Sequence, residues 1–177
     1  SQPIGNQDAF VTKFDAFGNR EWTKRIGIAG KSTTANNLVV DTNGNIFVSG
    51  VTNGALGGED LRGTVDGFVA RLTSDGAIVW VSHIGADQFI SSARGLSVDS
   101  NGHVGVVGAI TLPEGTLAFA ALFNATNGDN IWVQLISDNT FTVANAVALD
   151  KSGNLIVTGQ TNGGLDGNTI SAANNTD

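Results

Sequence analysis

Short apolar segments alternate with polar turns along the whole chain. From Ala9 to Phe14 the side chains alternate between two faces, with Phe10 and Phe14 on one face and Val11 on the other. This period of two residues is typical of a β-strand. No window has a sustained helical period, and turns rich in Gly and Asn separate the segments. The sequence therefore predicts an all-β protein built from short strands.

The segment pattern occurs three times in the chain. Aligned residues are separated by 58 positions between the first and second copies and by 51 or 52 between the second and third. A fixed period of this length indicates one supersecondary unit used several times. We place the repeats at approximately 8–65, 66–117 and 118–166 of a single domain, 1–177, with a tail at 161–177. The structural positions of the repeat are Phe10, Phe68 and Phe119, Trp22, Trp80 and Trp132, and the turn glycines Gly44, Gly102 and Gly153.

Each repeat contains four strand segments joined by turns. The Asn43–Gly44 pair between two of them predicts a tight hairpin turn of type I′, which needs two residues in the left-handed region. Four antiparallel strands joined in this way predict one blade of a β-propeller. The predicted fold class is therefore all-β, with propeller blades formed by three four-stranded antiparallel repeats of about 51–58 residues.

Three blades are too few for a closed propeller, which typically has four to eight. An open stack of blades leaves a strand edge exposed at each end. We expect other copies of the chain or missing blades to complete the closure. The chain is then a piece of a longer propeller, half of a six-bladed ring, or a unit that joins head to tail without closing.

The tail and the charge distribution bear on these alternatives. The tail is acidic and has no repeat of its own to join, and five of the nine basic residues lie between residues 13 and 31 of the first repeat. Addition of the tail to the edge of a neighbour near residues 1–8 predicts a ring or a fibre. The alternative for the tail is that it enters a fourth blade. The alternative for the charge distribution is that the charges form a solvated face. The assembly candidates are Asp8, Lys13, Arg20, Lys24, Arg25, Leu165, Asp166, Ile170 and Asp177.

Composition removes several classes of function. The 177 residues contain no Cys, which excludes disulfides, thiolate catalysis and Cys-ligated metal, and they carry a net charge of −7. This charge argues against nucleic acid as a partner. No apolar run approaches the roughly 18 residues of a membrane helix. The chain does not begin with Met, so we interpret Ser1 as a mature N-terminus or the edge of an excised fragment.

Candidate chemistry is sparse. The turns that begin at Asp41, Asp99 and Asp150 are similar to calcium loops, but Gly stands at the fourth place instead of the sixth and no closing Glu follows. We interpret them as turns in which Asp caps its own backbone, and keep the three aspartates as weak calcium candidates. His83 and His103 have no metal-ligand spacing around them and are interpreted as surface or strand residues. No catalytic residue and no cofactor are expected.

The best-preserved copy of the repeat resembles a known family. DAFVTKFDAFGNREWTKRIG followed by LVVDTNGNIFVSGVTNG resembles the SBBP-type bacterial β-propeller repeat of secreted and surface proteins. The third repeat also resembles the Trp-docking repeat of quinoprotein propellers, with Ala125, Gly128 and Trp132 in comparable places. These resemblances imply a propeller fold, an exported protein and tryptophans that pack between blades. They imply no catalytic mechanism, because such repeats are scaffolds with differing functions.

The sequence thus favours a non-enzymatic secreted structural protein. We expect copies to join head to tail into an extracellular filament, a tube or a closed oligomer, with other copies of the chain as partners. The alternative is a ligand- or host-binding surface module within a larger propeller. A quinoprotein-like enzyme fragment is the third hypothesis and the least favoured, because three blades cannot enclose a cofactor.

Overall fold

The computed structural model describes residues 3–137 and 141–165. The regular secondary structure of these residues consists of β-strands and one short 3₁₀ turn, η1 (Leu56–Gly58). The strands are β1 (Ala9–Phe14), β2 (Arg20–Ile26), β3 (Thr33–Val40), β4 (Ile46–Thr52), β5 (Asp66–Leu72), β6 (Ile78–Ile84), β7 (Ile90–Val98), β8 (His103–Leu112), β9 (Gly115–Asn124), β10 (Asn130–Ile136), β11 (Thr142–Leu149) and β12 (Leu155–Thr161). The predicted all-β class is confirmed.

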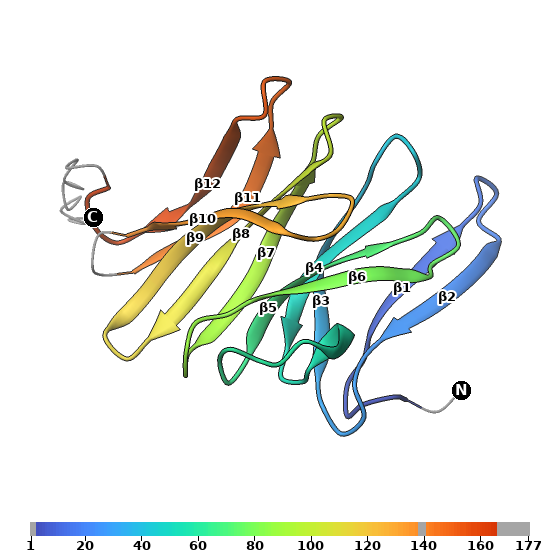
Figure 1. The fold of residues 1–177 in the computed structure, drawn as a ribbon, viewed down its shortest axis with the longest axis horizontal. Helices are drawn as coiled ribbons and strands as arrows, with labels where there is room; N and C mark the ends of the chain where they lie inside the picture. Colours follow the sequence, from blue (N-terminus) through green and yellow to red (C-terminus); the bar gives the residue numbers. More distant parts are fainter. Residues whose placement is uncertain (1–2, 138–140, 166–177) are drawn as a thin grey trace, which may run out of the picture.

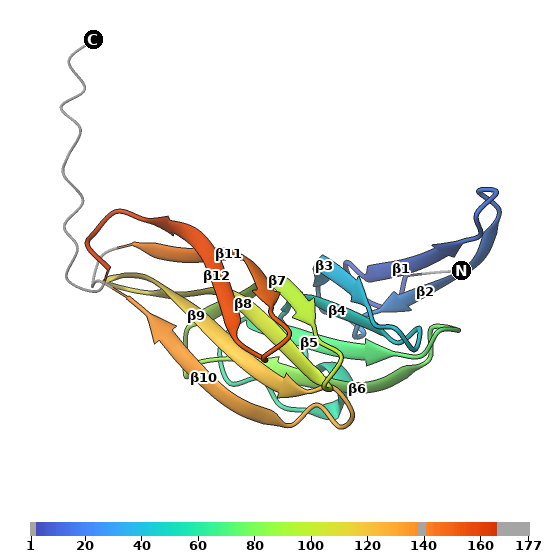
Figure 2. The same cartoon turned by 90° about the horizontal axis from the view of Figure 1, so that it is seen from above.

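The strands form two complete blades flanked by two half-blades (Figure 1). The complete blades are four-stranded antiparallel sheets with the orders β3-β4-β5-β6 and β7-β8-β9-β10. The half-blades are the two-stranded sheets β1-β2 and β11-β12. Figures 1 and 2 show them at opposite ends of the stack. The propeller-blade architecture predicted from the sequence is confirmed, with no closure among the described strands.

The blades are offset from the sequence repeats by two strands. The four strands of one repeat were predicted to form one blade, but β1-β2 and β3-β4 lie in different sheets. Residues 27–32 cross from the first sheet to the second without pairing β2 with β3. The longer loop 53–65 instead returns β4 to pair with β5, a strand of the next repeat. Each repeat therefore contributes the second half of one blade and the first half of the next.

Apolar layers fill the spaces between successive sheets. One layer lies between β1-β2 and the first complete blade and includes Val11, Ile26 and Phe68. A second lies between the complete blades and includes Phe47 and Phe119. A third, smaller layer lies between the second complete blade and β11-β12. Strands β5 and β8 are buried almost throughout because a sheet or loop covers both of their faces.

The hairpin turns differ from the predicted type. Gly44 has φ = 80°, and it is the one residue of the 41–45 turn in the left-handed region. A type I′ turn needs a second such residue at Asn43, so that prediction is wrong. The N–H of Gly44 donates to the carbonyl of Asp41, and the N–H of Asp41 donates to the carbonyl of Asn45. This is a tight turn closed by a single left-handed glycine, and the same hydrogen bonds recur at 150–154.

Candidate functional site

The junction inside each complete blade is a glycine opposite a phenylalanine. In the first blade Gly50 on β4 is the register partner of Phe68 on β5, and in the second Gly108 is the partner of Phe119. Both rings are fully buried, at 0% exposure. A Cβ atom on Gly50 would lie 2.7 Å from the Phe68 ring, and one on Gly108 would lie 2.9 Å from the Phe119 ring. The ring thus occupies the space that the glycine leaves, which fixes the strand register.

The N-terminal half-blade has the phenylalanine of this pair without the glycine. Strand β1 aligns with β5 and β9 in the repeat, and among the described strands it pairs with β2 alone. Phe10 occupies the place of Phe68 and Phe119, yet it is 67% exposed. Phe14, in the place of the fully buried Leu72, is also exposed. The half-blade therefore presents an apolar strand edge of the kind that a neighbouring strand covers elsewhere in the fold.

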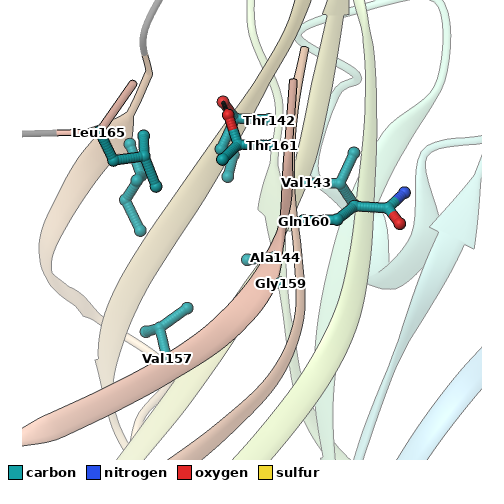
Figure 3. A pocket seen from close by; sticks show the side chains of 10 residues that line it. Thr142, Val143, Ala144, Val157, Gly159, Gln160, Thr161 and Leu165 are labelled. Atoms are coloured by element: carbon teal, nitrogen blue, oxygen red, sulfur yellow. Dashed lines mark hydrogen bonds between the residues drawn. The ribbon is translucent and has the colours of Figure 1, made fainter. Parts of the chain in front are cut away.

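The C-terminal half-blade has the glycine without the phenylalanine. Strand β12 aligns with β4 and β8, and Gly159 occupies the place of Gly50 and Gly108. No aromatic ring of the described chain lies against it. A pocket of about 160 Å³ opens there instead, and Val157, Leu165 and the hydrogen-bonded Thr142–Thr161 pair border it beside Gly159 (Figure 3). Its remaining lining residues are Ala118, Ile136, Val143, Ala144 and Gln160.

Tryptophans connect each blade to the turn of the next. Trp80 on β6 packs against Gly128, where a Cβ atom would lie 2.7 Å from the indole ring. Its Nε1–H donates to the carbonyl of Ala125 over 3.2 Å, and Ser82 Oγ donates to the carbonyl of Gly128 over 2.7 Å. The Ala125, Gly128 and Trp132 motif noted in the sequence therefore contributes its turn to Trp80 of the preceding blade.

The first tryptophan of the chain makes the same contact, but the last one does not. The Trp22 ring lies against Gly76 in the turn between β5 and β6. Trp132 packs beside the third apolar layer, but no turn of a following blade is present among the described residues. Conversely, Gly18 aligns with Gly76 and Gly128, and nothing lies within 4 Å of the place where its Cβ atom would be. Trp132, near the C-terminal end, thus has no docking glycine among the described residues, and Gly18, near the N-terminal end, has no docked tryptophan.

The charged assembly candidates gather on the N-terminal half-blade. Lys13 pairs with Glu21 over 2.6 Å, and Arg25 lies 4.0 Å from the Asp8 carboxylate. That carboxylate also accepts the backbone N–H groups of Ile4 and Gly5. The remaining basic candidates, Arg20 and Lys24, lie on β2. Leu165 lies at the other end of the molecule, and Asp166, Ile170 and Asp177 lie outside the described residues.

Sequence reasoning missed a buried pair between Asp66 and His83. The His83 ring is buried, with Nδ1 3.2 Å from Asp66 Oδ2 and Nε2 3.0 Å from the carbonyl oxygen of Leu56. His83 is therefore a core strand residue and not a surface one. The repeat alignment carried the signal, because Asp66 and His83 occupy the places of Asp8 and Arg25. In the third repeat the same two places hold leucines, Leu117 and Leu135.

The turn aspartates form internal hydrogen-bond networks. Asp41 Oδ1 accepts the N–H groups of Asn43 and Asn45, and Oδ2 accepts the side-chain amide of Asn45 at 2.7 Å. Asp150 forms the same three bonds with its own turn. Asp99 does so as well, with Nδ1 of His103 in the place of the amide. The described residues contain no group of three or more His, Cys, Asp or Glu side chains able to hold a metal ion.

These hydrogen bonds hold the pKa of each turn aspartate below its ordinary value. For Asp150 the largest cause is the side-chain amide of Asn154, followed by the backbone N–H of the same residue. For Asp41, burial raises the pKa, but the hydrogen bonds from the Asn45 amide and backbone outweigh it. The same balance, with His103 as the donor, lowers the pKa of Asp99. The ionised carboxylates therefore stabilise the turns.

We expect acid to destabilise the fold through these turns. A folded-state pKa below the unfolded value means that the stabilisation is present above the unfolded pKa, about 3.9, and is lost as the pH falls through the folded values. Urea unfolding at pH 7, 5, 4 and 3 is expected to show a free energy of unfolding that declines below about pH 4. A combined Asp41→Asn, Asp99→Asn and Asp150→Asn variant is expected to show a shallower decline. An unchanged pH dependence in this variant would contradict the assignment.

Comparison with known proteins agrees with the repeat found in the geometry. Residues 21–58 match the SBBP family, which is described as a β-propeller repeat. This matched segment, within the first of the three repeats, is similar to an SBBP β-propeller repeat. The matched residues run from the N-terminal half-blade through β3 and β4 to η1, so the SBBP repeat spans the junction between two blades. The other two copies of the repeat follow from the alignment within the chain.

A solved structure has a similar fold. It is the crystal structure of a protein of unknown function from Bacteroides caccae, with a TM-score of 0.53 and 11% sequence identity. The match covers 90% of this chain and 53% of that protein, so the chain spans about half of its length. At this identity the likeness is one of fold. Among curated proteins, no sequence matches the chain. No helix among the described residues is long and apolar enough to span a membrane.

Proposed function

We propose that the chain is a non-enzymatic structural protein whose copies join head to tail through shared blades. The observation that carries the proposal is the presence of two complementary half-blades at opposite ends of the stack. The β11-β12 hairpin corresponds to the first two strands of a blade, and the β1-β2 hairpin corresponds to the last two. One copy therefore supplies the hairpin that the other needs, and strand addition at a sheet edge is a common mode of association.

The arrangement of the free edges supports this pairing. In the complete blades the first hairpin joins the second through its later strand, as β4 joins β5 and β8 joins β9. The corresponding strands of the half-blades are β12 and β1. Strand β12 pairs only with β11, and β1 only with β2, among the described strands. Both free edges thus belong to the strands that the repeat pairs at this position.

A joint of this kind is heterologous, because one surface binds a different surface of the next copy. Each copy contributes two complete blades and two half-blades, which together amount to three blades. Two copies joined at both ends would form a six-bladed ring, within the usual range of propellers. If the rotation does not close, the same joint produces a filament.

The extracellular setting and the absence of catalysis are part of this proposal. The resemblance of the first repeat to SBBP-type repeats implies an exported protein, and the Cys-free composition is compatible with that setting. The described blades provide apolar layers and capped turns, which suit a scaffold. The role proposed is to build an extracellular filament, tube or closed oligomer from identical units.

A second function is favoured by one comparison. The chain spans 53% of the length of the similar solved protein, so its blades also suit a larger propeller within one polypeptide. In that case the chain is a ligand- or host-binding module of a surface protein, and hairpins of the same polypeptide cover both half-blades. The two functions differ in whether separate copies associate.

Light scattering and electron microscopy on the same purified sample test the proposed function. We expect particles larger than the 18.1 kDa chain, either a species of twice that mass or long regular assemblies. A twofold mass indicates the closed ring, and filaments indicate the open joint. A monomer of 18.1 kDa at every concentration, or amorphous aggregate without regular particles, would overturn head-to-tail assembly and favour the larger propeller.

A further inference from the structure

We infer that the pocket beside Gly159 binds the Phe10 side chain of a second copy, with Gly159 and Phe10 directly opposite in the strand register. This inference rests on the proposed function and assigns the anchor residue of its joint. The occupant is an aromatic side chain presented by a β-strand, and the pocket is the one bordered by Val157 and Leu165 (Figure 3).

The register follows from the two complete blades. Gly50 opposes Phe68 and Gly108 opposes Phe119, each in the pairing of the two middle strands. The repeat places Gly159 where those glycines stand and Phe10 where those phenylalanines stand. Pairing β12 with β1 of a second copy in the same way puts Gly159 opposite Phe10. One further pair of this register, equivalent to Val48 and Ala70, is Val157 and Thr12.

The pocket fits the ring in size and chemistry. Its volume is about 160 Å³, and most of its lining is aliphatic. An apolar cavity of about 150 Å³ is large enough to hold benzene. The backbone beneath the pocket is also built as in the complete blades. A Cβ atom on Gly50 would point at the carbonyl of Thr34 and at Ala35, and one on Gly159 would point at the equivalent Val143 carbonyl and Ala144. The described part of the chain supplies the glycine and the backbone beneath it but places no aromatic ring in the pocket.

A second observation independently points to the same hairpin. Trp22 packs on Gly76 and Trp80 packs on Gly128, each in the turn between the last two strands of the next blade. Trp132 would pack by the same rule on the turn between the last two strands of the blade that β11-β12 begins. If β1-β2 of a second copy completes that blade, this turn is residues 15–19. Gly18 in this turn is open, and the adjacent Phe17 is 91% exposed. Strand pairing and tryptophan docking thus require the same partner.

Disulfide trapping in the full-length chain tests the register. The chain has no Cys, so single-Cys variants report on one position each. We expect a mixture of Thr12→Cys and Val157→Cys chains to form a covalent heterodimer under mild oxidation, because directly opposed side chains meet disulfide geometry. The control mixture is Thr12→Cys with Thr161→Cys, whose positions lie four residues out of register, roughly 13 Å along the strand. Either single-Cys variant alone is expected to stay uncrosslinked, since the joint is heterologous.

A Phe10→Ala variant tests the anchor. We expect its assembly to weaken at least tenfold in dissociation constant, with an unfolding midpoint like that of the wild type under monomeric conditions. Phe10→Leu is expected to recover part of the affinity. Ile78→Ala is the matched control, because Ile78 is an exposed apolar residue of a complete blade away from the joint.

The outcomes separate this inference from the proposed function. If the wild type assembles but Phe10→Ala assembles equally well, or the out-of-register pair crosslinks as efficiently as Thr12 with Val157, the anchor and register are wrong and head-to-tail assembly stands. If the wild type remains a monomer, both are wrong. A covalent heterodimer from the in-register pair alone, together with loss of assembly in Phe10→Ala, supports both.

Discussion

A Phe68→Ala variant is expected to lose about 3–5 kcal/mol in free energy of unfolding, the usual cost of removing a buried aromatic ring. Phe68 is fully buried at the centre of the first complete blade, where its ring fills the space beside Gly50. Its apolar layer also holds the N-terminal half-blade through Val11 and Ile26. Removal of the ring therefore leaves a cavity in the junction of β4 with β5 and weakens the contact between two sheets. Urea unfolding at concentrations where the chain is monomeric measures the loss.

The matched control for this prediction is Phe10→Ala, which makes the same chemical change at the equivalent position of β1. Phe10 is 67% exposed in the single chain, so we expect the monomer to lose less than about 1 kcal/mol. The contrast isolates the effect of the missing strand, because residue type and place in the repeat are the same. Equal losses in the two variants would show that the exposed edge of β1 is covered within the single chain, which contradicts the half-blade description.

A Trp80→Ala variant is expected to cost about 3–5 kcal/mol by separating the two complete blades. The indole ring packs on Gly128, hydrogen-bonds to Ala125 and lies 6.1 Å from the Phe47 ring between centroids. Its loss removes packing on both blades and leaves the carbonyl of Ala125 with the Arg71 contact. A Gly128→Val variant approaches the same contact from the other side and is expected to be destabilised as well, since its Cβ atom would overlap the ring.

Trp132→Ala is the control for the tryptophan contact. No turn of a following blade covers Trp132 among the described residues, so its removal is expected to cost the monomer clearly less than removal of Trp80. In the assembled protein the order is expected to change, because Trp132 would then dock on the turn that contains Gly18. Chemical unfolding of both variants, first dilute and then at assembling concentrations, measures the difference. Equal costs in the dilute monomer would contradict the interpretation of these tryptophans as interblade contacts.

The sequence predicted the local units of this fold well. Period-two alternation and Gly/Asn turns located the strands, since both depend on neighbouring residues. The repeat alone predicts Phe68 and Trp80 as structural positions, and both make contacts inside or between the blades. The turn type was wrong because Asn–Gly also fits a turn in which only Gly44 adopts the left-handed conformation. The pattern of residues determined where the turn lies but not its backbone angles.

The division of strands among sheets did not follow from the repeat. A sequence repeat has no defined starting point, and any cyclic shift of four strands describes the period equally well. Which hairpins share a sheet depends on pairing across the 53–65 loop, a contact between residues distant in sequence. The same reason hid the candidate joint, because the exposure of Phe10 differs from that of Phe68 only through the absence of a neighbouring strand. The buried pair of Asp66 and His83 was missed because the residues at its two places differ between repeats, with Leu117 and Leu135 in the third.

Amide hydrogen exchange of the full chain distinguishes a paired strand edge from a free one, and it therefore tests the claim that β12 of one copy pairs with β1 of the next. The claim predicts that backbone amides on the free edges of β1 and β12 exchange rapidly in dilute protein. At assembling concentrations they would become as protected as those of β4 and β5, which are paired in the single chain. Rapid exchange of both edges in fully assembled protein would contradict the shared blade and place the contact between copies elsewhere.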